Sequence, residues 1–151
     1  MKLQKSPIPN SCVPTAFAMV LNIPIEQIIK ELGHKGDKII WPNLPEPSNR
    51  CGFHIQELVD ICIEHGYLVT HIEAIPTSVP YKGTKDADEY IVYFNEARLL
   101  KHITNSKGVI FGPTHAVAWS GDKIYDPKSK IYNLSECDFE ITDYYRIDKM
   151  I

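Results

Sequence analysis

The sequence predicts an α+β fold in which N-terminal helices pack on a mostly antiparallel β-sheet. In residues 12–32 and 54–65, apolar residues recur with the spacing of helices. After Tyr67 the pattern changes to short runs rich in Val, Ile, Tyr and Phe that are separated by turn residues, which is typical of strands. Helices followed by a series of strands indicate the α+β class.

Three helices are expected in the first part of the chain, over residues 12–22, 24–32 and 54–65. The first is apolar on nearly every side from Val13 onward, and such a helix belongs in a core. The other two carry an apolar stripe on one face, and Gly33 and Gly66 follow them as helix-ending residues. Residues 34–52 hold several prolines and are expected to form a long loop.

The rest of the chain is expected to supply the sheet. The expected strands span residues 68–75, 89–94, 108–111, 115–119, 123–125 and 143–147. Residues 76–88 are expected to form a loop and residues 96–103 a short helix. Residues 120–123 are expected to form a turn that joins the fourth and fifth strands into a hairpin, with Trp119 opposite Ile124.

Length and composition indicate a single globular domain over residues 1–151. Hydrophobic residues make up 44% of the chain and charged residues 23%, which is an ordinary globular balance. The net charge of −3 provides no broad basic face, so we expect no nucleic-acid partner. Because we find neither a signal-peptide core nor an apolar run of roughly 20 residues, we expect a cytoplasmic protein without a membrane partner. Its four cysteines would then be reduced thiols.

Cys12 is the candidate nucleophile because it stands where a loop enters the predicted buried helix. The free N–H groups and the positive dipole of a helix start stabilise a thiolate and lower its pKa. Asn10 or Ser11 could cap this helix, and Pro14 lies in its first turn, where a missing N–H costs little.

A cysteine nucleophile also needs a base, and the base needs an orienting group. His115 begins one strand of the predicted hairpin, and Asp126 ends the other. Counting along paired strands places His115 close to Pro127, about one residue past Asp126. A carboxylate there would hold the imidazole by one ring nitrogen while the other nitrogen faces Cys12.

These residues resemble the papain-like cysteine peptidases, and more closely the C39-like bacterial and phage peptidases. That family places its cysteine at the start of the central helix, its histidine in a pattern like Gly-x-x-His-Ala-Val-Ala, and its aspartate in a pattern like x-x-Asp-Pro. Residues 112–118 and 124–127 match these two patterns, and the order Cys, His, Asp also fits.

The resemblance implies a papain-like fold and a cysteine hydrolase that cleaves a peptide or isopeptide bond in a peptide or protein substrate. Cys12, His115 and Asp126 would form its catalytic triad and work through a thioester intermediate, with no metal and no cofactor.

The match is weaker at the oxyanion hole. The family usually has Gly or Ala after the cysteine, where this chain has Val13, and a glutamine six residues before it, where this chain has Ser6. Gln4, eight residues before Cys12, and Asn10 are the candidate side-chain donors beside the backbone N–H of Cys12.

Other interpretations stay open at this point. The same triad would serve an acyltransferase or a glutamine deamidase, because the first half-reaction is the same. A catalytically idle relative that binds a peptide, as a regulatory module, is the alternative from another class. Zinc held by Cys51 with His54, or by Cys62 with His65, is a competing interpretation, but no second clean ligand pair follows. The sequence indicates neither the substrate sequence nor the oligomeric state.

Overall fold

The computed structural model describes residues 1–36, 52–73, 77–80, 89–92, 101, 104–139 and 141–150. The described helices are α1 (Cys12–Leu21), α2 (Ile25–Leu32) and α3 (Ile55–Glu64). All three expected N-terminal helices are confirmed, with ends that differ from the predicted ones by at most one residue. Most of the loop expected over residues 34–52, and all of the helix expected over residues 96–103 except Lys101, lie outside the described residues.

Helix α1 is the centre of the helical layer. All its residues from Pro14 to Leu21 are buried, as its apolar sequence predicts. The helix ends at Asn22, which adopts a left-handed conformation and donates its N–H to the last carbonyl groups of the helix. No single described helix is long and apolar enough to cross a membrane; only α1 and α2 together meet that test, as a pair bent by 116° at the break between them.

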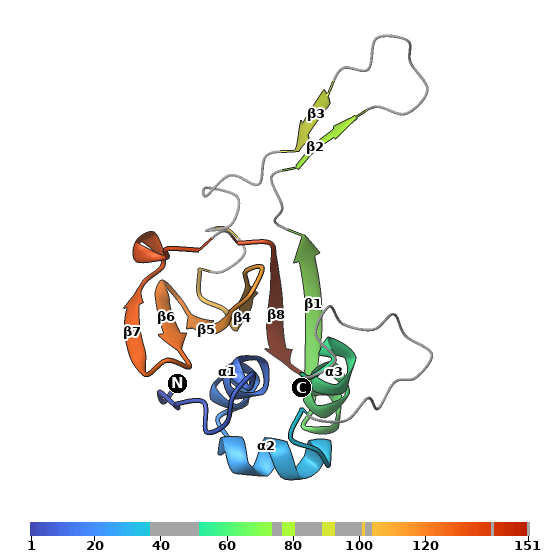
Figure 1. The fold of residues 1–151 in the computed structure, drawn as a ribbon, viewed down its shortest axis with the longest axis vertical. Coiled ribbons are helices and arrows are strands. Elements are labelled where there is room, and N and C mark those ends of the chain that lie inside the picture. Colours follow the sequence, from blue (N-terminus) through green and yellow to red (C-terminus); the bar gives the residue numbers. More distant parts are fainter. Residues whose placement is uncertain are drawn as a thin grey trace.

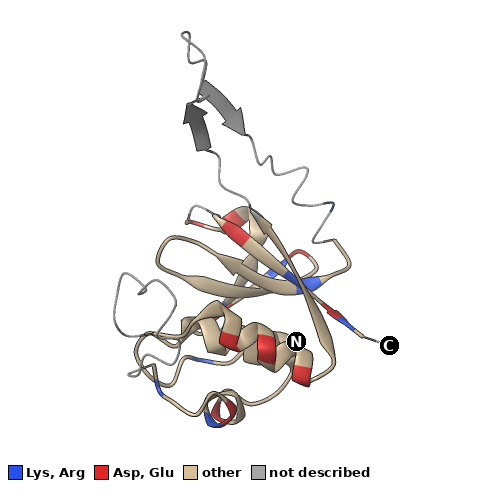
Figure 2. Ribbon diagram, turned by 90° about the vertical axis from the view of Figure 1, so that its right-hand side faces the viewer, with Lys and Arg blue, Asp and Glu red and all other residues tan. Residues whose placement is uncertain are grey.

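Helices α2 and α3 lie beside α1 on the same side of the main sheet (Figures 1 and 2). Helix α2 buries Ile25 and Ile28 and ends at Gly33, which has a φ of 78°. Helix α3 begins with a capping box, in which the His54 ring accepts a backbone N–H and the Glu57 carboxylate accepts the N–H of His54.

The main sheet of the described residues has six antiparallel strands in the order β1-β8-β4-β5-β6-β7. These strands are β1 (Tyr67–Glu73), β4 (Lys107–Phe111), β5 (Ala116–Ser120), β6 (Lys123–Asp126), β7 (Lys130–Asn133) and β8 (Asp143–Lys149), with the short 3-10 helix η1 (Leu134–Glu136) between the last two. Strands β2 (Thr77–Pro80) and β3 (Glu89–Val92) pair with each other. Helices on one side of an antiparallel sheet confirm the predicted α+β class (Figure 1).

Two strands lie where the sequence predicts none. Strand β2 falls inside residues 76–88, which the prolines mark as a loop, and β7 follows the Asp126-Pro127 turn. Each has only four residues, and its partner strand supplies the backbone hydrogen bonds. Such short strands carry little local signal because pairing, rather than intrinsic propensity, decides their conformation.

The hairpin formed by β5 and β6 has the predicted register, with Trp119 opposite Ile124. Its turn is shorter than predicted, because Ser120 and Lys123 are themselves a pair of the ladder. The loop is therefore two residues long and includes Gly121, whose φ of 62° suits this kind of tight turn.

Two hydrophobic clusters cover the two faces of the sheet, and strand β5 contributes alternate residues to each. Ala116 and Ala118 belong to the cluster that contains the buried residues of the helices. Val117 and Trp119 belong to the other cluster, which also includes Tyr144. This alternation places the helical layer against one defined face of the sheet, and the first residue of α1 lies near the beginning of β5.

Candidate active site

Cys12 is the first residue of α1, as predicted, and its side chain is half-buried. The preceding turn includes Asn10, which has a φ of 60° and is exposed. Ser11 occupies the N-cap position, but its hydroxyl donates to the carbonyl of Ile8 over 2.6 Å rather than capping the helix. The capping role expected for Ser11 is therefore wrong. The first turn of α1 also carries no acidic residue, so its dipole favours an anion at Cys12.

His115 and Asp126 meet at one end of the β5 and β6 hairpin. His115 directly precedes β5 and Asp126 is the last residue of β6. The Nε2 atom of His115 lies 2.8 Å from Oδ1 of Asp126, and the two side chains are 14% and 4% exposed. The predicted hairpin therefore brings this pair together.

The His115 ring also forms a hydrogen bond with the Cys12 side chain. Because Nε2 is bound to Asp126, Nδ1 is the ring nitrogen that can face the sulfur. Burial alone would raise the pKa of the Cys12 thiol. The hydrogen bonds from His115 and from the backbone N–H of Ala116, the charge of His115 and the N–H of Val13 outweigh burial and lower that pKa.

The pKa of His115 moves in the opposite direction. Its hydrogen bond with Cys12 raises the pKa, burial opposes this, and the hydrogen bond and charge of Asp126 raise it further. A lowered thiol pKa beside a raised imidazole pKa shifts the proton-transfer equilibrium toward a thiolate–imidazolium pair. Such a pair can attack a carbonyl carbon and then protonate the leaving group.

Gln4 lies at the other end of α1. Its side-chain Nε2 donates to the carbonyl of Ile23 over 2.8 Å, and its Oε1 accepts the N–H of Ile25 over 2.8 Å. Both partners follow the C-terminal end of α1, which is roughly 15 Å from the start of this ten-residue helix. The structure does not bring Gln4 to Cys12, so its expected oxyanion role needs correction: its amide joins the N-terminal segment to the turn between α1 and α2.

Asn10 and the backbone N–H of Cys12 remain the oxyanion candidates. The N–H of Cys12 belongs to the first turn of α1, whose N–H groups have no intrahelical acceptor. The side chain of Asn10 is exposed, two residues before the sulfur in sequence. These donors are close to the thiol by chain connectivity.

The structure adds groups around Asp126 that sequence reasoning missed. Oδ1 of Asp126 also accepts the backbone N–H of Lys128 over 2.9 Å, and Oδ2 accepts the hydroxyl of Tyr132 over 3.1 Å. The ring of Phe139 contacts the His115 ring edge-on, with 5.7 Å between the centroids. The adjacent strand-favouring residues Ile131 and Tyr132, after the Asp126-Pro127 turn, were the available signal for a strand that returns Tyr132 to Asp126.

The other described cysteines differ from Cys12 in the direction of their pKa shifts. Burial raises the pKa of Cys62 to about 12, and burial also raises the pKa of Cys137. Cys51 lies outside the described residues. Nδ1 of His54 accepts a hydrogen bond at the start of α3, and His65 is hydrogen-bonded to Glu31. Within the described parts of the chain, no three His, Cys, Asp or Glu side chains are grouped to hold a metal ion.

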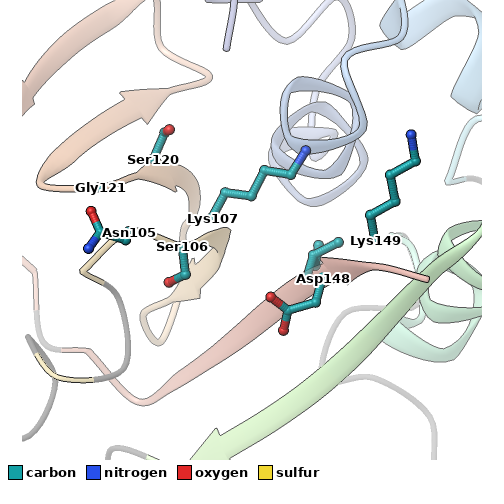
Figure 3. Close-up of a pocket in the computed structure, with 8 residues that line it drawn as sticks. Asn105, Ser106, Lys107, Ser120, Gly121, Asp148 and Lys149 are labelled. Carbon is teal, nitrogen blue, oxygen red and sulfur yellow. The ribbon is translucent and has the colours of Figure 1, made fainter. Parts of the chain in front are cut away.

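A pocket of about 460 Å³ lies at the end of β5 that is farthest from His115. Figure 3 shows residues that line it. It is lined by the beginning of β4, the end of β5 and the end of β8. From its edge, Lys107 reaches toward α1, where its Nζ donates to the carbonyl of Val20 over 3.0 Å. This pocket is at the C-terminal end of α1, whereas Cys12 is at the N-terminal end, so it is separate from the candidate active site.

No protein-family model and no curated protein matches the sequence. Among solved structures, the chain is similar to a double glycine motif protease from an AMS/PCAT transporter, crystallised in complex with the leader peptide. The match has a TM-score of 0.59 and 15% sequence identity, and it covers 99% of this chain and 91% of that chain. This similarity confirms the papain-like, C39-like fold that the sequence motifs implied.

Proposed function

We propose that the protein is a papain-like cysteine hydrolase that cleaves a peptide or isopeptide bond. The observation that carries the proposal is the hydrogen-bonded series Cys12, His115, Asp126 at the start of a buried helix, with a lowered thiol pKa. A merely structural cysteine in an apolar setting has a raised pKa, as Cys62 does.

In the proposed reaction, the thiolate of Cys12 attacks the substrate carbonyl while the imidazolium of His115 is held by Asp126. The N–H of Cys12, with Asn10 as the candidate second donor, stabilises the oxyanion. His115 gives its proton to the leaving amine, and a thioester forms. Water then loses a proton to His115, attacks the thioester and releases the acid and the thiolate.

A peptide is the substrate class that the fold supports best. The similar double glycine motif protease was crystallised with a leader peptide, so this fold can accommodate a peptide chain. The proposal needs a reduced Cys12, which a cytoplasmic location would provide. We propose no nucleic-acid or membrane partner and no cofactor.

One observation favours a second candidate, the catalytically idle module that only binds a peptide. Gln4 is the available glutamine near the position where the family has its oxyanion donor, and its amide is bound instead to Ile23 and Ile25. A site with one oxyanion donor fewer would lose roughly two to three orders of magnitude in rate.

Incubation with a mixed peptide library, followed by mass spectrometry, separates these functions. We expect new peptide termini with the wild-type protein, none with Cys12→Ala, and unchanged products with the control Cys62→Ala, because Cys62 is buried in another helix. Acylated amines would indicate a transferase, and glutamine converted to glutamate would indicate a deamidase. Retention of uncleaved peptides by wild-type and Cys12→Ala protein alike would contradict the hydrolase proposal and support the binding module.

A further inference from the structure

We propose that Tyr132 is a positioning residue of this site, whose hydroxyl holds the carboxylate of Asp126 and thereby sets the direction in which His115 faces Cys12. This inference rests on the proposed function. It extends the site to strand β7, which neither the sequence motifs nor the similarity to a solved structure assigns to catalysis.

The hydrogen bonds of Asp126 divide between its two oxygens. Oδ1 accepts from His115 Nε2 and from the backbone N–H of Lys128, at 2.8 and 2.9 Å. Oδ2 accepts from the Tyr132 hydroxyl at 3.1 Å. The Asp126 side chain is 4% exposed, so water has little access to replace a lost donor. With a donor on each oxygen, rotation of the carboxylate about its Cβ–Cγ bond breaks hydrogen bonds on both sides.

The Tyr132 hydroxyl is fixed as a donor. A carboxylate accepts but does not donate, so the phenol must supply the hydrogen. Burial raises the pKa of Tyr132, and the charge of Asp126 and the hydrogen bond to it raise that pKa further. The phenol therefore keeps its proton across the pH range in which a cysteine hydrolase works.

The position of Tyr132 is set by the same hairpin that carries Asp126. In the β6 and β7 ladder, Tyr132 pairs with Ile124 and Asp126 pairs with Lys130. The Tyr132 ring packs against the hydrophobic cluster on the face of the sheet away from the helices, and the Lys130 ammonium lies 5.5 Å from the ring centroid. The hydroxyl is thus held by strand pairing and packing, without help from a substrate.

Loss of the Tyr132 hydroxyl should affect Cys12 indirectly, first through Asp126 and then through His115. Oδ2 would be left unsatisfied in a buried place, the carboxylate would turn or draw in water, and His115 would be held less firmly. The thiolate would then lose part of the support that lowers its pKa. Because a hydrogen bond to a charged group is involved, we expect a loss of roughly tenfold in kcat, with KM nearly unchanged.

The test is Tyr132→Phe, with Tyr125→Phe as the matched control. Tyr125 is on β6 of the same hairpin, but its ring packs with the cluster on the helical side. For each folded variant, the rate of Cys12 alkylation is measured from pH 5 to 10, a readout that requires no substrate. We expect Tyr132→Phe to move the alkylation profile to higher pH, and Tyr125→Phe to leave it in place.

An unmoved profile in Tyr132→Phe, while His115→Ala moves it, would overturn this inference and leave the proposed function standing. An unmoved profile in both would overturn the proposed function as well. Should Tyr132→Phe fail to fold, the proton NMR spectrum of the unaltered protein decides the question. A slowly exchanging Tyr132 hydroxyl proton is the expected result, and a hydroxyl in rapid exchange with water would contradict the inference.

Discussion

The two ends of helix α1 use the same helix dipole in opposite ways. At the N-terminal end, the half-buried thiol of Cys12 has a lowered pKa and a hydrogen bond with His115. At the C-terminal end, the Lys107 ammonium binds the carbonyl of Val20, and the Gln4 amide binds the chain that follows. A positive helix end favours an anion and a negative end favours a cation.

The two ends of α1 differ in whether their polar side chains remain available to react. Lys107 and Gln4 use their polar atoms to satisfy backbone groups, and such bonds contribute to folding. Cys12 and His115 instead interact with each other, and Cys12 is only half-buried beside the core. The comparison indicates that changes at the C-terminal end should lower stability, whereas changes at the N-terminal end should lower reactivity.

Removal of the reacting groups should have the largest effect. We expect Cys12→Ala and His115→Ala each to lower peptide turnover by at least about a thousandfold, because one loses the bond-forming atom and the other the proton carrier. Turnover is measured with any peptide found in the library experiment, and circular dichroism checks the fold. Cys62→Ala is the control. Full turnover in either variant would refute the triad.

Asp126→Ala should have a smaller effect, a partial loss of turnover, because Asp126 transfers no proton and forms no covalent bond. The pKa of Cys12 should rise, since the imidazolium partner is held less firmly. Kinetics and the pH dependence of Cys12 alkylation measure both effects. If neither changes, Asp126 is a turn residue only; Asp122 cannot replace it, because it lies in the β5–β6 turn at the other end of the hairpin from His115.

Gln4→Ala should change stability instead of reactivity. The variant loses two hydrogen bonds to the α1–α2 turn, so we expect about 1–2 kcal/mol less stability and a Tm lower by several degrees. The alkylation profile of Cys12 should match that of the wild type. A lower kcat at unchanged Tm would instead return Gln4 to the oxyanion hole and break the contrast between the two ends.

Lys107→Met should have the smallest effect. It keeps most of the apolar stem but removes the charge from the C-terminal end of α1, which costs about 0.5–1 kcal/mol. Thermal unfolding of the wild type and the variant measures this loss of stability. Because salt screens the charge of Lys107, the difference between the two proteins should be smaller in high salt. A shift in the Cys12 alkylation profile would mean that the two ends are coupled, contrary to our account.

The sequence was sufficient for features that have strong local patterns. The all-round apolar run after Cys12 predicts α1, and the turn around Gly121 predicts the register that brings His115 and Asp126 together. Strand β7 was missed because four residues of mixed polarity acquire their conformation from pairing with β6. Tyr132 could not be assigned without that strand.

The oxyanion donor was misplaced for a related reason. A spacing of eight residues between Gln4 and Cys12 suggests proximity to the thiol, but the intervening loop runs along α1 toward its other end. Two hydrogen bonds fix that path: the Gln4 amide nitrogen donates to the carbonyl of Ile23, and the Gln4 amide oxygen accepts the N–H of Ile25. Because these are tertiary hydrogen bonds, the sequence contains no local periodic pattern that predicts them.

The most direct test of the central claim is the rate of iodoacetamide labelling of each cysteine in the wild-type protein as a function of pH. The thiolate is the reacting form, so a lowered pKa extends the reaction to lower pH. We predict that Cys12 labels first under mildly acidic conditions, while Cys62 and Cys137, whose pKa values are raised, react only at higher pH. Labelling of Cys62 or Cys137 before Cys12, or a Cys12 profile at or above that of an ordinary thiol, would contradict the account.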